Sequence, residues 1–131
     1  MLLKFRVWMK SLKWMCDVTN ISFDSKFLDI CQKGDTERYT EMSVEFDEGE
    51  IELMQSTDMV DRDGKIIFEG DIVKMSKDVY SEPTYYEVVR HRGGAYRLES
   101  KQHGCELWLR HTDCEVVGNV YENLELLEDK E

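Results

Sequence analysis

Apolar and polar residues alternate with a period of two along much of the chain. In Lys4–Met9 every second residue from Phe5 is apolar, and Met42–Phe46 repeats this with Ser43 and Glu45 on the other face. This period is that of a half-buried strand. Segments rich in β-branched and aromatic residues predict further strands at Ile21–Phe23, Phe27–Cys31, Ile51–Met54, Ile66–Phe68, Ile72–Met75, Tyr85–Arg90, Ala95–Glu99, Cys105–Leu109 and Glu115–Val120.

Glycine-containing dipeptides separate these segments. Asp63-Gly64, Gly70-Asp71, Gly93-Gly94 and His103-Gly104 all stand where a chain of short strands must reverse. Many short strands at close spacing predict a mainly β fold, an antiparallel barrel or sandwich. Two helices are considered: a short C-terminal one in Glu122–Glu128, and a less supported alternative within Thr36–Met42.

The size of the chain predicts one domain over residues 1–131. Its 131 residues correspond to a typical domain, and with one Pro and eight Gly it has no composition typical of a flexible linker. A hydrophobic content of 41% can form a core. The first ten residues interleave charges with apolar residues, and no segment is long and apolar enough to cross a membrane. We therefore expect a cytoplasmic protein.

The net charge is −11, and the excess is local. Residues 41–63 contain nine acids and one base, and residues 115–131 contain six acids and one Lys, so these segments carry −8 and −5 and the other 91 residues carry +2. Such a field repels nucleic acid and anionic membranes, so we expect direct binding to neither.

The acidic segment 41–63 has two interpretations. The simpler is a solvated face. In the functional interpretation, carboxylates two residues apart on a strand are spaced by roughly 7 Å, close to the phosphate spacing of a nucleic-acid strand. Such an anionic stripe would fit the basic channel of a nucleic-acid enzyme. The candidate partner-binding residues are Glu45, Glu48, Glu50, Glu52 and Asp58.

Residues 90–110 show the opposite charge pattern. Five bases stand against Glu99 and Glu106, with Tyr96 and Trp108 among them. Basic and aromatic residues together are typical of nucleic-acid binding. In so acidic a chain, a face of internal salt bridges or a contact for an acidic partner is the favoured interpretation.

Two segments carry family motifs. The segment Gln55–Lys74 runs from Thr-Asp-Met through Asp-Arg-Asp-Gly-Lys to Ile-Ile-Phe-Glu-Gly-Asp-Ile-Val, and Cys114–Leu127 contains Glu-Val-Val-Gly-Asn-Val-Tyr-Glu-Asn-Leu-Glu-Leu-Leu. With the opening Lys4–Trp8, they resemble the YopX family of small phage and prophage proteins. Two positions depart from the family pattern, where Asp58 replaces a Gly and Leu124 replaces a Pro.

The resemblance implies a β-rich domain with an SH3-like barrel, here with extra strands, and a phage-encoded origin without an established activity. In physical terms the motifs are structural. Residues 61–64 would form a turn, Ile66 and Phe68 would face inward, and Gly70 would allow a reversal. Gly118-Asn119 would mark a bulge or a close approach.

Signatures of catalysis and of common cofactors are missing from the sequence. It has no nucleophile elbow, phosphate loop, dinucleotide fingerprint or metalloprotease helix. We therefore predict a non-enzymatic protein with no cofactor. Packed free thiols are the favoured interpretation of the four Cys residues, and structural zinc is the alternative. The candidate ligands are Cys16, Cys31, His111 and Cys114.

Three functions follow from these features. The first is a phage accessory protein that binds a host protein, such as the nucleic-acid-binding effector of a CRISPR defence, and inhibits it. The second is a structural or assembly protein that forms homo-oligomers through exposed strand edges. The third is a small nucleic-acid-binding barrel that uses residues 90–110.

Overall fold

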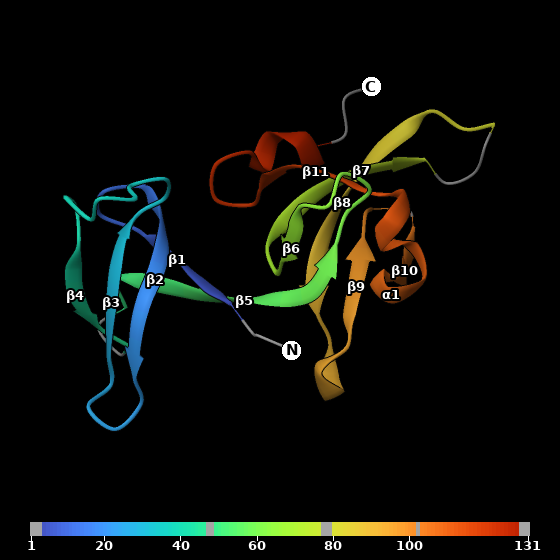
Figure 1. Cartoon of the computed structure of the whole chain (residues 1–131). Helices are drawn as coiled ribbons and strands as arrows, with labels where there is room; N and C mark the ends of the chain where they lie inside the picture. Colours follow the sequence, from blue (N-terminus) through green and yellow to red (C-terminus); the bar gives the residue numbers. More distant parts are fainter. Residues whose placement is uncertain (1–3, 47–48, 77–79, 102, 129–131) are drawn as a thin grey trace. The chain divides into compact units, whose positions relative to one another are not determined.

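The computed structural model describes residues 4–46, 49–76, 80–101 and 103–128 (Figure 1). The chain divides into two compact units, the N-terminal unit Leu2–Gln55 and the C-terminal unit Ser56–Glu131. The boundary lies within the strand β5 (Ile51–Val60), which contributes residues 51–55 to one unit and 56–60 to the other. The expectation of one domain over the whole chain stays a prediction.

The N-terminal unit is an antiparallel sheet with strand order β4-β3-β2-β1-β5. In its centre, Val7 lies opposite Cys16 on one side and Leu53 on the other. Besides residues 51–55 of β5, its strands are β1 (Phe5–Met9), β2 (Trp14–Ser22), β3 (Phe27–Gln32) and β4 (Met42–Glu45).

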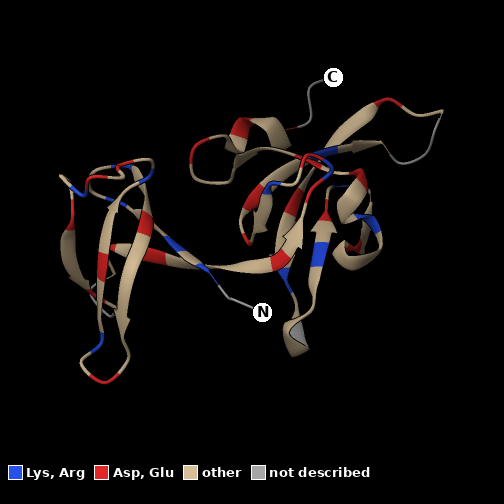
Figure 2. Cartoon of the chain, viewed as in Figure 1, with Lys and Arg blue, Asp and Glu red and all other residues tan. Residues whose placement is uncertain are grey.

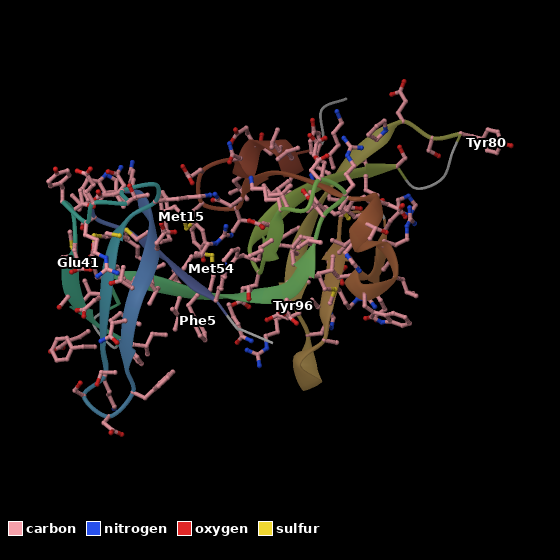
Figure 3. All side chains as sticks on the ribbon, viewed as in Figure 1. Phe5, Met15, Glu41, Met54, Tyr80 and Tyr96 are labelled. Carbon is pink, nitrogen blue, oxygen red and sulfur yellow. The ribbon has the colours of Figure 1, made fainter. Side chains whose placement is uncertain are left out.

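Both faces of β1 are buried. On one face a core forms around Val7, Met9, Leu28 and Ile30, as the alternating pattern predicts. On the other face lies a second cluster of Trp8, Met15 and Met54, of which the two methionines are labelled in Figure 3. Burying such side chains stabilises a fold by about 1.5–3 kcal/mol each. The sequence pattern predicts the first cluster but not the second.

The C-terminal unit contains a second antiparallel sheet, with strand order β10-β9-β8-β7-β11, while β6 pairs with residues 56–60 of β5. The core joins Ile67 of β6 to Val73, Tyr86, Val88 and Leu98 of the five-stranded sheet. The strands are β6 (Ile66–Phe68), β7 (Asp71–Ser76), β8 (Pro83–Arg90), β9 (Tyr96–Glu99), β10 (Gly104–Glu106) and β11 (Glu115–Asn119).

The predicted mainly β fold is confirmed, with one qualification for the barrel. Among the described residues the sheets do not close on themselves: β4 and β6 end one strand order, and β10 and β11 end the other. The predicted C-terminal helix forms as the 3-10 helix η3 (Leu124–Leu127), which packs on β8. No helix among the described residues of the whole chain has the length and apolar character of a membrane span.

The predicted strand Cys105–Leu109 is wrong beyond Glu106. The chain turns there into the short helix α1 (Leu107–Arg110), followed by η2 (His111–Asp113). Leu107 is fully buried, whereas Trp108 and Leu109 are largely exposed, so three consecutive apolar residues do not form one buried face. The other short helix is η1 (Arg92–Gly94) in the β8–β9 connection.

Two further details differ from the sequence prediction. The alternative helix in Thr36–Met42 is absent, because these described residues form turns and Arg38 has a left-handed backbone (φ +61°). In β6 the fully buried residue is Ile67, while Ile66 and Phe68 are only half-buried. The inward face of this strand is therefore the reverse of the one predicted.

Bulges explain why two strands are longer than predicted. The pairing of β2 with β3 shifts register between Val18 and Asn20, and that of β5 with β6 shifts between Ser56 and Val60. A bulge inserts an extra residue and interrupts the alternation on which the prediction depends. In β5 the bulge includes Asp58, whose left-handed backbone (φ +64°) fits a position that is Gly in the family motif.

Candidate functional site

The five carboxylates predicted to bind a partner occupy different settings. Glu52 forms an ion pair with Lys10 (Oε1 to Nζ 3.1 Å), and Glu50 accepts a hydrogen bond from the Ser11 amide (2.7 Å). The hydrogen bonds from Ser11 lower the pKa of Glu50. Asp58 is exposed in the C-terminal unit, and Glu48 lies outside the described residues. Glu50, just before β5, and Glu52, within it, therefore both contact residues of the β1–β2 turn.

Glu45 lies on a different surface, the acidic face, which we define as Asp29, Glu41 and Glu45. Asp29 and Glu45 extend from the face of β3 and β4 opposite the buried Leu28. Glu41, labelled in Figure 3, precedes β4 and lies 3.0 Å from the Thr19 hydroxyl. Figure 2 shows acidic residues on these strands. The structure thus groups Glu45 with two acids outside the predicted set.

One exposed phenylalanine adjoins the acidic face. Phe27 lies directly opposite Glu45 in the β3–β4 ladder and is 40% exposed. Phe23 is 69% exposed but belongs to the other side of the sheet. It packs edge to face on Phe46, with ring centroids 6.0 Å apart, and Phe46 packs against the core around Val7. Exposed aromatic side chains beside charges are typical of protein interfaces. The pairing of Phe27 with Glu45 was not predicted from the sequence, because the two residues come from separate segments.

In the C-terminal unit, Asp61 of the family motif is structural. Its carboxylate is buried and accepts three backbone N–H bonds at 2.9 Å, from Asp63 and Lys65 in the β5–β6 turn and from Val116 in β11. Burial alone would raise the pKa of Asp61, but these three bonds outweigh it and lower the pKa. Asp61 therefore fixes the turn to the edge of β11 and is not available to a partner.

The other motif residues also stabilise turns. Asp71 accepts the Phe68 amide (2.8 Å) across the reversal at Gly70, whose φ is +86°. The register of β11 shifts at Gly118, as predicted, and a Cβ there would lie 2.4 Å from Oδ1 of Asn123. The same Oδ1 accepts the Asn119 amide at 3.2 Å. These contacts support the structural interpretation of both motifs.

The candidate zinc ligands are divided between the two units. Cys16 and Cys31 lie in the N-terminal unit, and His111 and Cys114 in the C-terminal unit. Among the described residues no group of three or more His, Cys, Asp or Glu is placed to hold a metal ion. The four cysteines of the chain are free thiols.

The cysteine and histidine contacts show what these side chains do in the structure. Burial raises the pKa of Cys16 to about 11 and that of Cys114 to about 12. Cys114 donates to the Arg110 carbonyl (3.3 Å), and Nδ1 of His111 lies 2.7 Å from the Val60 carbonyl. Neutral, buried thiols are poor nucleophiles and poor metal ligands at neutral pH.

The basic segment 90–110 contains internal ion pairs. Arg97 contacts Glu99 (3.0 Å) and Glu106 (2.6 Å), and His91 also contacts Glu99 at 3.3 Å. Arg110 contacts Asp113 at 2.8 Å. The guanidinium groups of Arg97 and Arg110 are thus neutralised locally, as expected for a face of internal salt bridges. Tyr96, labelled in Figure 3, packs against the core instead of forming a stacking surface.

A cavity of about 640 Å³ lies in the C-terminal unit, in the size range of small-ligand sites. Its cationic lining residues are Arg62, Lys74 and Arg110, and its acidic ones are Asp113 and Glu115. Sequence reasoning missed it because the cations lie 12 and 36 residues apart and meet only through the pairing of β7 with β11. The only sequence signal is the alternation that places Lys74 on the face of β7 opposite Val73 and Met75.

Comparison with known proteins agrees with this architecture. The family model described as YopX protein matches residues 4–128, so the chain belongs to the YopX family. Among solved structures, protein EF1440 from Enterococcus faecalis is similar, with 29% identity, a TM-score of 0.63, and coverage of 98% of this chain and 99% of that one. YopX from Bacillus subtilis is similar in fold, with 22% identity, a TM-score of 0.62, and coverage of 95% and 98%. The comparison with curated proteins gave no match.

Proposed function

We propose that this YopX-family protein is a non-enzymatic, phage-encoded accessory protein of the host cytoplasm that binds a host protein. The observation that carries the proposal is the acidic face with Phe27 exposed beside it. The carboxylates would steer a basic partner surface toward this face, and the exposed aromatic side chain would serve as an apolar anchor in the complex. The partner class is a nucleic-acid-binding effector, and the most specific form of the proposal is inhibition of a CRISPR-type defence.

The polar groups of the family motifs support a non-enzymatic role. Asp61 and Asp71 accept backbone hydrogen bonds and are nearly inaccessible to solvent. The raised pKa values of Cys16 and Cys114 keep both thiols protonated near neutral pH. The motif residues thus maintain the fold, and binding is assigned to side chains outside the motifs.

Charge reversal tests the proposal. The double variant Asp29→Lys/Glu45→Lys is compared with wild type as bait in host lysate, at about 0.05 and 0.3 M salt, two ionic strengths that differ strongly in screening. The expected result is that a protein with a basic surface is captured by wild type at low salt and lost with the variant. A matched control, Glu122→Lys/Glu125→Lys, reverses two acids of the C-terminal unit and should retain capture. Equal capture by wild type and the Asp29/Glu45 variant would contradict the proposal.

A second candidate function is self-association through β4. This strand ends the sheet order. Because the Phe46 amide bonds to the Lys26 carbonyl, antiparallel alternation directs the N–H groups of Glu45 and Ser43 away from β3. An unpaired edge of this kind can accept a strand from another copy.

The oligomeric state discriminates the two functions. Self-association predicts a stable oligomer by light scattering that Ser43→Pro converts to monomer, because proline removes the outward N–H. A wild-type monomer at all concentrations would reject this second candidate and would leave the host-protein proposal as the sole one.

A further inference from the structure

The cavity of the C-terminal unit combines charged and apolar walls. Lys74 extends from β7 and Glu115 from β11, and the two residues are paired across the ladder. The exposed Pro83 supplies apolar surface, whereas Met75, which also lines the cavity, is 3% exposed and packs in the core. With three cations against two carboxylates, the lining has a net charge of +1 in a chain of net −11. A locally positive cavity in an acidic protein attracts anions that the rest of the surface repels.

Two of the three cations are held in place by neighbouring groups. Nη2 of Arg62 lies 2.8 Å from Oε1 of Glu115. Arg110 is bound on two sides, with Nε 2.8 Å from Oδ2 of Asp113 and Nη2 donating to the Ser76 carbonyl at 2.9 Å. Both guanidinium groups therefore have fixed positions and compensated charges. Side chains that are already held by neighbouring groups lose less conformational entropy when a ligand binds.

Lys74 has no such compensation. It forms no ion pair with any of the residues that the structure describes, although Glu115 is its neighbour across the ladder. The Glu115 carboxylate is engaged by Arg62 instead. Among the described residues, the ammonium group of Lys74 is thus the cation of the cavity that remains to be paired, and the exposed Pro83 also lines the cavity.

From this arrangement we infer that the cavity is a binding site for an aliphatic carboxylate. The carboxylate pairs with Lys74, and its short apolar chain contacts Pro83. A monoanion is favoured over a dianion, because Arg62 and Arg110 are already paired with Glu115 and Asp113 and leave Lys74 as one uncompensated cation. The carboxylate can come from a small organic acid or from the C-terminus of a peptide. This site is independent of the acidic face and of the function proposed for it.

The test is an NMR titration of the full-length ¹⁵N-labelled protein at pH 7. The probes are butyrate, inorganic phosphate, and N-acetyl-Ala-Ala with a free C-terminal carboxylate or as its amide. The expected result is saturable shifts of the Ser76, Thr112 and Glu115 amides with butyrate in the millimolar range, and weaker binding of phosphate. A peptide acid that binds more tightly than butyrate, while its amide does not bind, identifies a peptide terminus. Equal binding of butyrate and peptide acid identifies a small acid.

Two variants make the inference falsifiable. Lys74→Gln should weaken butyrate binding about tenfold, since a charge-assisted hydrogen bond is lost, and Lys101→Gln is the matched control. Glu115→Gln should strengthen binding several-fold because it removes a competing carboxylate and releases Arg62. The inference is overturned if no saturable shift appears by about 50 mM butyrate, if Lys74→Gln leaves the affinity unchanged, if Glu115→Gln weakens it, or if phosphate binds more tightly than butyrate.

Discussion

The acids of the family motif in the C-terminal unit and the predicted partner-binding acids of the N-terminal unit have different environments. In the C-terminal unit the carboxylates of Asp61 and Asp71 are buried and accept backbone N–H groups. In the N-terminal unit Glu45, Glu50 and Glu52 are at the surface, and the latter two contact the β1–β2 turn. An acidic segment is therefore not one functional surface merely because it is continuous in sequence. Asp61 and Asp71 are buried and paired with backbone N–H groups, whereas Glu52 on β5 is half-exposed and pairs with the side chain of Lys10.

The largest expected effect comes from Asp61→Asn. The amide NH2 that replaces Oδ2 would face the Val116 N–H, so the variant should lose about 3 kcal/mol of unfolding free energy. Urea denaturation measures this loss. The control is Asp63→Asn, which alters an exposed acid of the same turn and should cost less than about 0.5 kcal/mol. If the two variants are equally stable, Asp61 is not structural and the comparison between the units fails.

The stability difference between wild type and Asp61→Asn should also depend on pH. The folded pKa of Asp61 is lowered, so its stabilising contribution is present above the unfolded pKa of about 3.9 and is lost as the pH falls through the folded value. The stability difference between wild type and Asp61→Asn should therefore be full at pH 7 and narrow in acid. A difference that grows below about pH 4 would contradict this assignment.

A smaller loss is expected for Gly118→Ala. The added Cβ would lie 2.4 Å from Oδ1 of Asn123, and the shift this requires should cost about 2 kcal/mol in thermal or urea denaturation. Adding Asn123→Ala should recover part of that loss, because the colliding oxygen is removed. If the losses of unfolding free energy from Gly118→Ala and Asn123→Ala simply add in the double variant, the collision with Asn123 is not the cause of the destabilisation.

Asp58 tests the departure from the family pattern. Since its φ is +64°, Asp58→Gly should be neutral or slightly stabilising, and Asp58→Val should cost about 1 kcal/mol. Chemical denaturation of the pair, with Asp58→Asn as the control for charge, measures the backbone contribution. If Asp58→Val leaves the free energy of unfolding unchanged, the bulge in β5 does not require a left-handed backbone at residue 58.

The smallest effect is expected in the N-terminal unit. Glu52→Gln breaks an ion pair with Lys10 in which both side chains are 47% exposed, so it should change stability by no more than about 0.5 kcal/mol. Addition of about 0.5 M salt should remove the effect, because exposed pairs are screened. A loss as large as that of Asp61→Asn would remove the distinction between surface and structural acids.

Much of the fold could be predicted from the sequence, and the exceptions have physical causes. Met42–Phe46 and Glu115–Val120 form strands as expected, because alternation and turn residues agree there. The bulges in β2 and β5 break the alternation, so those strands are longer than predicted. Leu107–Arg110 forms a helix because burying Leu107 alone, with Trp108 and Leu109 exposed, requires the chain to leave the sheet.

The sites were less predictable than the fold. The structural role of Gly118 and Asn119 followed from turn chemistry, because the backbone imposes it locally. The grouping of Glu45 with Asp29 and Glu41 depends on strand pairing between distant segments. The cavity around Lys74 likewise forms only when β11 pairs with β7. Non-local pairing is the information that a single sequence lacks.

The most direct test of the structural role assigned to Asp61 is the NMR titration of its carboxyl carbon in the folded protein. We expect a pKa below the ordinary value for Asp, because the three backbone donors outweigh the cost of burial. That pKa should shift little between low and high salt, since the donors are local and shielded from solvent. An Asp61 that titrates at or above the ordinary value, with a strong response to salt, would contradict this role.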